Sequence, residues 1–257
     1  MSKHTCSAKE LAKKNHRDLI ILWQDEDYVV LDKPAQLLTI PDRFDKEEPN
    51  LHAILKGRYG TILVVHRLDY ETSGVICFAK NSEAHRALSL QFERHEVEKI
   101  YLALARGQVP DEAGEIRFPV AEHRVRDGRM AVDKRHGKEA ITRYRVLEHF
   151  RDFTLLEITP LTGKTHQIRV HCQAIGHPLA VDPLYGSPDP IFLSSLKPRF
   201  LKKRDEEEKP LISRLALHAR SLAFTHFRSH GQVRVEAPQP RDFRAMITQL
   251  KKWNRQP

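Results

Sequence analysis

Short apolar runs separated by polar residues recur along the chain, with the length and spacing of β-strands. In LIILWQDEDYVVLDKP, residues 19–34, two apolar runs flank the polar letters QDED and end at Pro34, which predicts two strands joined by a turn. Two later runs, AITRYRVLEHF and FTLLEITPL, predict an antiparallel pair over 140–150 and 153–161. The remaining strands are predicted at 61–68, 74–80, 98–107, 214–226 and 231–237.

Other segments repeat their apolar residues at helical spacing instead. In the segment 81–96, Ala84, Leu88 and Phe92 fall one turn apart on one face. A later helix is expected to begin at Thr165 and to end where glycine and proline follow. The helices are predicted at 50–60, 81–96, 165–178 and 241–253.

The order of these elements shows neither an internal repeat nor a regular alternation of strand and helix. Many strands with few helices predict an α+β fold around a mostly antiparallel mixed sheet. Residues 1–17 are polar and rich in lysine and are interpreted as a basic N-terminal tail, which leaves 18–257 for a single domain. Within that domain, the mixed charge run over 197–210 is expected to form an exposed insertion loop.

Charge and cysteine usage narrow the environment of the protein. The 257 residues carry a formal net charge of +9, which attracts polyanions, nucleic acid before anionic membrane. The cysteines, Cys6, Cys77 and Cys172, are widely spaced and odd in number, which indicates a reducing compartment rather than a disulfide framework. The longest apolar run near the N-terminus, LIILW, is too short for a signal peptide or a membrane span. We therefore expect a cytoplasmic protein.

The stretch HRLDYETSG, residues 66–74, places charged residues between two apolar runs. If the preceding run is a strand, Arg67 and Asp69 share one face and point from the strand end into a loop, where scaffolds often carry chemistry. The alternative is a structural turn in which the Asp69 carboxylate accepts N–H groups from Glu71 or Thr72. Local chemistry alone favours the structural turn.

Several sequence blocks, taken together, favour a functional role for Asp69 over the structural turn. HRLDYETSG resembles the signature of the RluA-type family of RNA pseudouridine synthases, and the other blocks follow in the order of that family. Beside residues 66–74, the resemblance rests on VLDKP at 30–34, EKIYLALARG at 98–107, RMAV at 129–132, GKEAITRYRVL at 137–147, TPLTGKTHQIRVHCQAIGHPLAVDPLYG at 159–186 and RLALHARSLAF at 214–224.

The resemblance implies a pseudouridine synthase catalytic domain, split into two halves with a central RNA-binding cleft. It implies an isomerase that converts uridine to pseudouridine in structured ribosomal or transfer RNA, without a cofactor or a metal. Asp69 is then the catalytic carboxylate, and Arg169 is the cation that keeps it ionised. Tyr101 is expected to stack on the target base and to take part in proton transfer.

Arg67, Lys164, His166 and Lys33 are the expected substrate-binding residues. Lys164 and His166 lie at the start of the helix predicted to carry Arg169, a place that suits a phosphate. Arg67 is expected to act as a wedge or phosphate contact beside a flipped nucleotide, and Lys33 is either a support of the site or an ordinary lysine at a strand end. His166 and His171 have the wrong spacing for a zinc site and lack a third ligand. The expected partner is RNA, with no DNA and no membrane, and the protein is expected to be a monomer.

The chain departs from the family pattern at two positions of the long motif. Lys164 stands where arginine is usual, which keeps the charge, and Val181 stands where glycine is usual, which puts the conformation of that turn in question.

Two other functions stay open at this point. A non-catalytic RNA-binding protein of the same fold would be expected to lack the Asp, Tyr or Arg, all of which are present. A glycoside hydrolase would need a second carboxylate across the scissile bond, and the only nearby candidate, Glu71, lies in a predicted turn.

A dense basic stretch, HRVRDGRMAVDKRHGK at 123–138, carries many more basic than acidic residues. Gly128 suits a tight turn between its two arms. We expect a hairpin or loop that grips RNA outside the catalytic core, and the alternative is a solvated loop without function. The charged residues are Arg124, Arg126, Arg129, Lys134, Arg135 and Lys138, with Asp127 and Asp133.

Overall fold

The computed structural model describes residues 19–42, 45, 47–123, 125, 128–200 and 207–255. The chain forms two compact units. The first takes the described residues up to Val97 together with Ser221–Pro238, and the second takes those of Glu98–Arg220 and Gln239–Pro257. The predicted tail, 1–17, and residues 201–206 of the predicted insertion lie outside the described residues.

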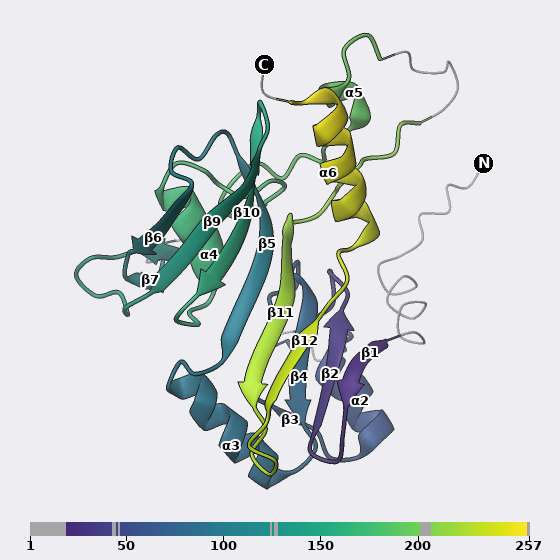
Figure 1. Ribbon diagram of the computed structural model, residues 1–257, viewed down its shortest axis with the longest axis vertical. Coiled ribbons are helices and arrows are strands. Elements are labelled where there is room, and N and C mark those ends of the chain that lie inside the picture. The colour runs from purple at the N-terminus through teal and green to yellow at the C-terminus, as the bar shows by residue number, and fades with distance from the viewer. Residues whose placement is uncertain are drawn as a thin grey trace. The chain divides into compact units, whose positions relative to one another are not determined.

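The first unit is built on the strands β1 (Ile20–Gln24), β2 (Tyr28–Lys33), β4 (Ser73–Ala79) and the second half of β11 (Leu217–Thr225), which neighbour one another in that order (Figure 1). The short β3 (Leu63–Val64) pairs with β4, and β12 (Gln232–Glu236) pairs with β11. The predicted turn at QDED is confirmed, because the Asp25 carboxylate accepts the N–H groups of Asp27 and Tyr28. Residues 28–31 and 75–79 are buried, as expected for continuous apolar strands.

Two predicted helices of the first unit are confirmed. They are α2 (Leu51–Tyr59) and α3 (Ser82–Glu93). Each begins after an asparagine whose side chain accepts an N–H from the first turn, Asn50 from Ala53 and Asn81 from Ala84, both at 2.9 Å. Both caps act on residues three positions away, so they depend on the local sequence alone.

The strand predicted over 61–68 is largely wrong. Only β3 forms a ladder with β4, and residues 65–72 follow an irregular path. The reason is that side chains take the places a ladder would need: the His66 ring bonds the N–H of Cys77, and the Thr39 hydroxyl bonds the main chain of Leu68. Arg67 and Asp69 therefore lie in a loop, and the argument that they share a strand face does not hold.

The second unit is also built on a predominantly antiparallel arrangement of strands. Its order is the first half of β11, then β5 (Glu98–Arg106), β10 (Phe153–Pro160), β9 (Ile141–His149) and β6 (Ala113–Arg117). The predicted β9–β10 pair is confirmed. A separate two-stranded sheet joins β7 (Val120–Glu122) to β8 (Met130–Val132).

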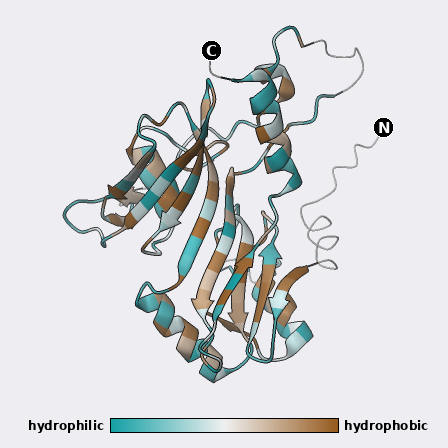
Figure 2. Ribbon diagram, in the orientation of Figure 1, coloured by the Kyte–Doolittle hydropathy of each residue, from teal (hydrophilic) through white to brown (hydrophobic). Residues whose placement is uncertain are grey.

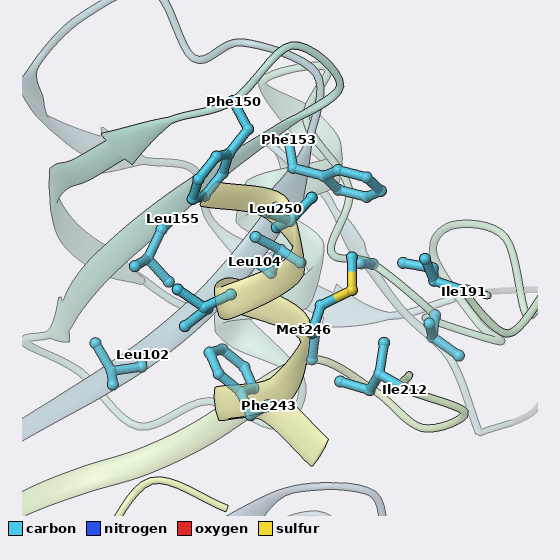
Figure 3. Packing of buried hydrophobic residues seen from close by; sticks show 14 of the residues in the cluster. Leu102, Leu104, Phe150, Phe153, Leu155, Ile191, Ile212, Phe243, Met246 and Leu250 are labelled. Carbon is cyan, nitrogen blue, oxygen red and sulfur yellow. The ribbon is translucent and has the colours of Figure 1, made fainter. Parts of the chain in front are cut away.

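Helices cover both faces of the second unit's strands. Side chains alternate along β5, so successive residues pack against different helices. Leu102 and Leu104 pack with α6 (Arg241–Trp253), whereas Ala103 and Ala105 pack with α4 (Gln167–Ala174). Figure 3 shows the α6 side of this core, and Figure 2 shows that α6 carries both hydrophilic and hydrophobic residues. The α6 bounds match the predicted 241–253, and the short α5 (Leu193–Leu196) was not predicted.

The α+β class and the mostly antiparallel mixed sheet are confirmed. Cys77 and Cys172 are buried free thiols. In the portion of the chain covered by the structure, none of the helices combines the length and apolar character that a membrane crossing requires.

Candidate functional site

The loop that carries Asp69 is fixed on both sides of this residue. On one side, the buried hydroxyl of Thr39 donates to the carbonyl of Leu68 at 2.8 Å and accepts the Leu68 N–H at 3.2 Å. On the other side, the carbonyl of Tyr70 accepts the N–H of Gln36 at 2.8 Å. Because both flanking residues are held, the position of Asp69 in space is determined by contacts of its loop with residues 36–39.

Lys33 is part of the same support. Its side chain is fully buried, and its ammonium donates to the carbonyls of Pro34, Leu37 and Tyr70 at 3.0, 2.7 and 3.3 Å. The first two carbonyls belong to the segment after β2, and the third belongs to the loop that carries Asp69. An ammonium in this position favours the predicted support role over direct contact with RNA.

The turn after Asp69 is closed by a main-chain hydrogen bond. The N–H of Thr72 donates to the main-chain carbonyl of Asp69 at 3.1 Å, so this hydrogen bond does not use the carboxylate. Asp69 is half-buried, and Arg67 is exposed. Thr72 is buried, and its hydroxyl has no hydrogen-bond partner among the described residues.

Tyr101 lies in the second unit, near the start of β5 and opposite Ile158 of β10. It is partly buried and packs against the core cluster on the α4 side of the strands. Lys99, two residues earlier, points to the same side, and its ammonium donates to the Thr162 carbonyl at 3.4 Å. Burial lowers the pKa of Lys99 to about 8. The alternation along β5 already placed Lys99 beside Tyr101, but we did not select it from the sequence.

The loop that carries Lys164 is organised by the buried side chain of Gln167. Its amide oxygen accepts the hydroxyl of Thr162 at 2.7 Å and the N–H of Lys164 at 3.0 Å. Its amide nitrogen donates to the carbonyl of Ile141 at 3.0 Å and to the hydroxyl of Thr142 at 2.9 Å. A single glutamine therefore holds this loop against the end of β9.

The predicted helix over 165–178 begins later and is shorter than expected. It is α4, Gln167–Ala174, and the residue before it, His166, has a left-handed backbone with φ of 53° and makes no capping hydrogen bond with its side chain. The ring of His166 turns instead to the hydroxyl of Tyr185, at 2.9 Å from Nδ1. Thr165, where the helix was predicted to begin, therefore lies before α4.

Arg169 forms a buried bidentate ion pair with Asp182. Its Nε and Nη2 lie 2.9 and 2.7 Å from the two carboxylate oxygens, and the side chains are 3% and 0% exposed. The same carboxylate accepts the N–H groups of Leu184 and Tyr185. From the sequence, only Asp69 was expected as the carboxylate partner of Arg169. Within the second unit the partner is Asp182, which stands in the quoted DPLYG block, and the pairing with Asp69 stays a prediction.

Val181 keeps the backbone conformation that glycine would favour. Its φ is 54°, and its side chain, 2% exposed, packs in the core beside α6. A β-branched residue in the left-handed region costs on the order of 1–2 kcal/mol, which the burial of the side chain offsets. The departure from the family pattern thus leaves the turn before Asp182 in place.

The two histidines considered as metal ligands each have protein partners. Burial lowers the pKa of His171, whose Nδ1 lies 3.0 Å from the Thr142 hydroxyl and whose Nε2 lies 2.9 Å from the Phe118 carbonyl. The His166 ring contacts Tyr185. Among the residues with described positions, no three His, Cys, Asp or Glu side chains are grouped as metal ligands.

The basic stretch contributes the second strand of a hairpin whose first strand, β7, lies just before it. We call residues 120–138 the basic hairpin: β7 pairs with β8, and the Asp133 carboxylate accepts the N–H groups of Arg135 and His136 in the turn that follows. Gly128 has φ of 71°, in the left-handed region predicted for the turn. Lys134 and Arg135 are exposed, and Arg124, Arg126 and Asp127 lie outside the described residues.

The sequence model of the family described as RNA pseudouridylate synthase matches residues 27–174, more than half of the chain. The chain belongs to this family. The matched region contains Asp69, Tyr101 and Arg169, and also Thr39 and Gln167, which were not selected from the sequence.

Curated relatives of this RNA pseudouridylate synthase family member cover most of its length. A ribosomal large subunit pseudouridine synthase D of Nitrosomonas europaea is 38% identical over 241 residues, 91% of this chain and 65% of the relative. A second, from Neisseria meningitidis, is 36% identical over 91% of this chain and 61% of its own length. A dual-specificity RNA pseudouridine synthase RluA of Vibrio cholerae is 33% identical over 82% of this chain and 78% of its own length. The chain thus spans a little under two thirds of the first two relatives.

Solved structures of the family share the fold. Human RNA pseudouridylate synthase domain containing 4 superposes with a TM-score of 0.68 at 27% identity, over 95% of this chain and 97% of that one. Human RNA pseudouridylate synthase domain containing 1 superposes with a TM-score of 0.67 at 29% identity, over 88% of this chain and 85% of that one.

Proposed function

We propose that this protein converts uridine to pseudouridine in structured RNA, with Asp69 as the catalytic carboxylate. The observation that carries the proposal is the position of Asp69: it lies in the matched family region, on a loop whose flanking residues are held by Thr39, Gln36 and Lys33. A carboxylate fixed in this way is suited to repeated attack on one atom of a bound nucleotide.

The proposed reaction breaks the bond between N1 of uracil and C1′ of ribose and forms a bond between C5 and C1′. C5 loses its proton and N1 gains one, so the product is an isomer. Asp69 attacks either the sugar or the base, and both routes require an ionised carboxylate and a nucleotide extruded from its stack.

The other proposed roles follow the same resemblance. Tyr101 supplies a ring for the base and a hydroxyl for proton transfer, and Arg169 supplies the cation that keeps Asp69 ionised. Arg67, Lys164 and His166 contact the RNA backbone. Arg169→Ala is a poor test of the pairing with Asp69, because it also leaves Asp182 buried without its partner, at a cost of about 3–5 kcal/mol. Arg169→Lys keeps a cation beside Asp182 but loses the bidentate geometry, so it tests the geometry of the guanidinium rather than its charge.

The proposed substrates are ribosomal and transfer RNA. The Nitrosomonas relative is named for the large ribosomal subunit, and the Vibrio relative is named as having dual specificity. The net charge of +9 supports a polyanionic substrate. The proposed location is the cytoplasm, and the proposed assembly is a monomer.

The first experiment maps pseudouridines in total RNA from cells with and without the gene, which identifies the substrate. A transcript of that RNA labelled with tritium at C5 of uridine then tests the chemistry. Asp69→Asn is expected to bind the transcript with near wild-type affinity and to release no tritium, because the change removes little beyond the charge. Asp111→Asn, at an exposed bend, is the matched control and is expected to keep full activity.

Substantial tritium release by Asp69→Asn would refute the catalytic assignment. Binding of the transcript by the wild-type protein without any tritium release would favour the non-catalytic RNA-binding alternative.

A further inference from the structure

Tyr185 contacts three parts of the candidate site, the basic hairpin, His166 and Arg169. No role was assigned to it from the sequence. Its ring is buried in a small core with Val120, Val170 and Met130. Because Val120 and Met130 belong to the basic hairpin and Val170 belongs to α4, this core joins the hairpin to the helix that carries Arg169. The ring of Tyr185 is therefore one of the apolar contacts between the two.

The hydroxyl of Tyr185 bonds both neighbours as well. It accepts the main-chain N–H of Met130 at 2.8 Å, and it lies 2.9 Å from Nδ1 of His166. Since it accepts from Met130, its own proton is available to the His166 nitrogen, and we assign the proton to the hydroxyl on that basis. One oxygen atom thus contacts both the His166 ring and the main chain of β8.

The face of the Tyr185 ring has a third contact. The guanidinium carbon of Arg169 lies 5.0 Å from the ring centroid, within the range of a cation–π interaction. The Asp182 carboxylate that binds Arg169 also accepts the Tyr185 N–H. The plane of the guanidinium is therefore fixed by the carboxylate on one side and by the ring on the other.

We propose that Tyr185 is a positioning residue with two separable roles: its hydroxyl orients His166 and the basic hairpin for RNA binding, and its ring orients Arg169 for the reaction. The proposal rests on the proposed function, because it takes His166 as an RNA contact and Arg169 as part of the catalytic site. It predicts that the two roles can be removed one at a time.

Two substitutions separate the roles. Tyr185→Phe keeps the ring and removes the hydroxyl, so the affinity for RNA should fall about 5- to 10-fold while the rate at saturating RNA stays within about 2-fold. Tyr185→Leu also removes the ring, so the rate at saturating RNA should fall a further 10-fold or more. The measurements are binding and single-turnover tritium release with unmodified transcripts of ribosomal and transfer RNA.

Tyr28 provides matched controls for general loss of stability. It is fully buried in the first unit, and its hydroxyl donates to the Ala84 carbonyl at 3.1 Å. Tyr28→Phe and Tyr28→Leu should lower the unfolding midpoint as much as the Tyr185 variants do, yet leave the affinity and the rate of the folded protein unchanged.

A double variant tests whether the hydroxyl acts through His166. If it does, Tyr185→Phe should cost less affinity in a His166→Ala background than in the wild type, and the loss that remains reports the contribution of the basic hairpin. Fully additive losses would overturn this part of the proposal. A Tyr185→Leu protein that is folded and reacts at the wild-type rate would overturn the role of the ring.

These results are distinguishable from a failure of the proposed function. If the wild-type protein releases no tritium from either transcript, the proposed function fails, and the role of the ring in the reaction fails with it. The affinity measurements still decide the role of the hydroxyl. If the wild-type protein is active and all Tyr185 variants match it, only the roles given to Tyr185 are wrong.

Discussion

The Thr39 hydroxyl offers a sharp test of how the fold positions Asp69. Thr39→Val replaces the hydroxyl with a methyl group of similar size, so no large cavity forms. The carbonyl and N–H of Leu68 then lose their partners, which lie at 2.8 and 3.2 Å in the structure. The Asp69 side chain remains, but Leu68, the residue before it, no longer has these hydrogen bonds to residue 39.

The expected cost can be estimated from these two hydrogen bonds. Each contributes on the order of 1 kcal/mol, and a buried group left unpaired costs about 1–3 kcal/mol, so the free energy of unfolding should fall by about 2–4 kcal/mol. For a chain of this size, the thermal midpoint falls by about 2–4 °C for each kcal/mol. Because small displacements of a reacting group are costly, we expect the single-turnover rate at saturating RNA to fall about 10- to 100-fold.

The second unit contains a near-identical pair of hydrogen bonds that serves as the control. The Thr154 hydroxyl donates to the Gly107 carbonyl at 2.8 Å and accepts the Val109 N–H at 3.0 Å. Thr154→Val should therefore lose comparable stability, measured by urea unfolding, and keep its rate within about 2-fold. Equal losses of rate in the two variants would assign the effect to stability, and an unchanged rate in Thr39→Val would refute the positioning argument.

Three further predictions concern other groups of the candidate site. Tyr101→Phe keeps a ring for stacking, so the transcript should still bind while the rate per bound complex falls about 100-fold or more; lost affinity with an unchanged rate would contradict a role in proton transfer. Changing Lys134 and Arg135 of the basic hairpin to alanine should flatten the dependence of RNA affinity on salt by about 0.7–0.9 for each phosphate that is no longer neutralised, and an unchanged slope would indicate a merely solvated loop. Burial lowers the pKa of Lys99 from 10.5 to about 8, so the folded state binds fewer protons than the unfolded state between these values. The free energy of unfolding should therefore rise with pH across that window, and this rise should be absent in Lys99→Met, as urea titrations at several pH values can check.

The sequence alone determined the features that depend on nearby residues. The caps at Asn50 and Asn81 act on residues three positions away, and the amphipathic pattern of 241–253 needs only a core to face. The long β9–β10 hairpin joins neighbouring runs across a short turn. The order of motifs also predicted the family and named Asp69, Tyr101 and Arg169, because these residue types recur in fixed local patterns.

Only the tertiary structure decided how those residues are held. The run over 61–68 has the composition of a strand, yet it stops at Val64 because the main chain of Leu68 bonds Thr39, 29 positions earlier. Likewise, the sequence left Lys33 as either a support of the site or an ordinary strand-end lysine, and only the fold placed its ammonium against the Tyr70 carbonyl. Hydrogen bonds between distant segments leave no periodic pattern in either one, and the free energy they contribute exists only when the fold brings the segments together. For this reason the sequence named Asp69 as the expected catalytic carboxylate but did not show which contacts hold its loop in place.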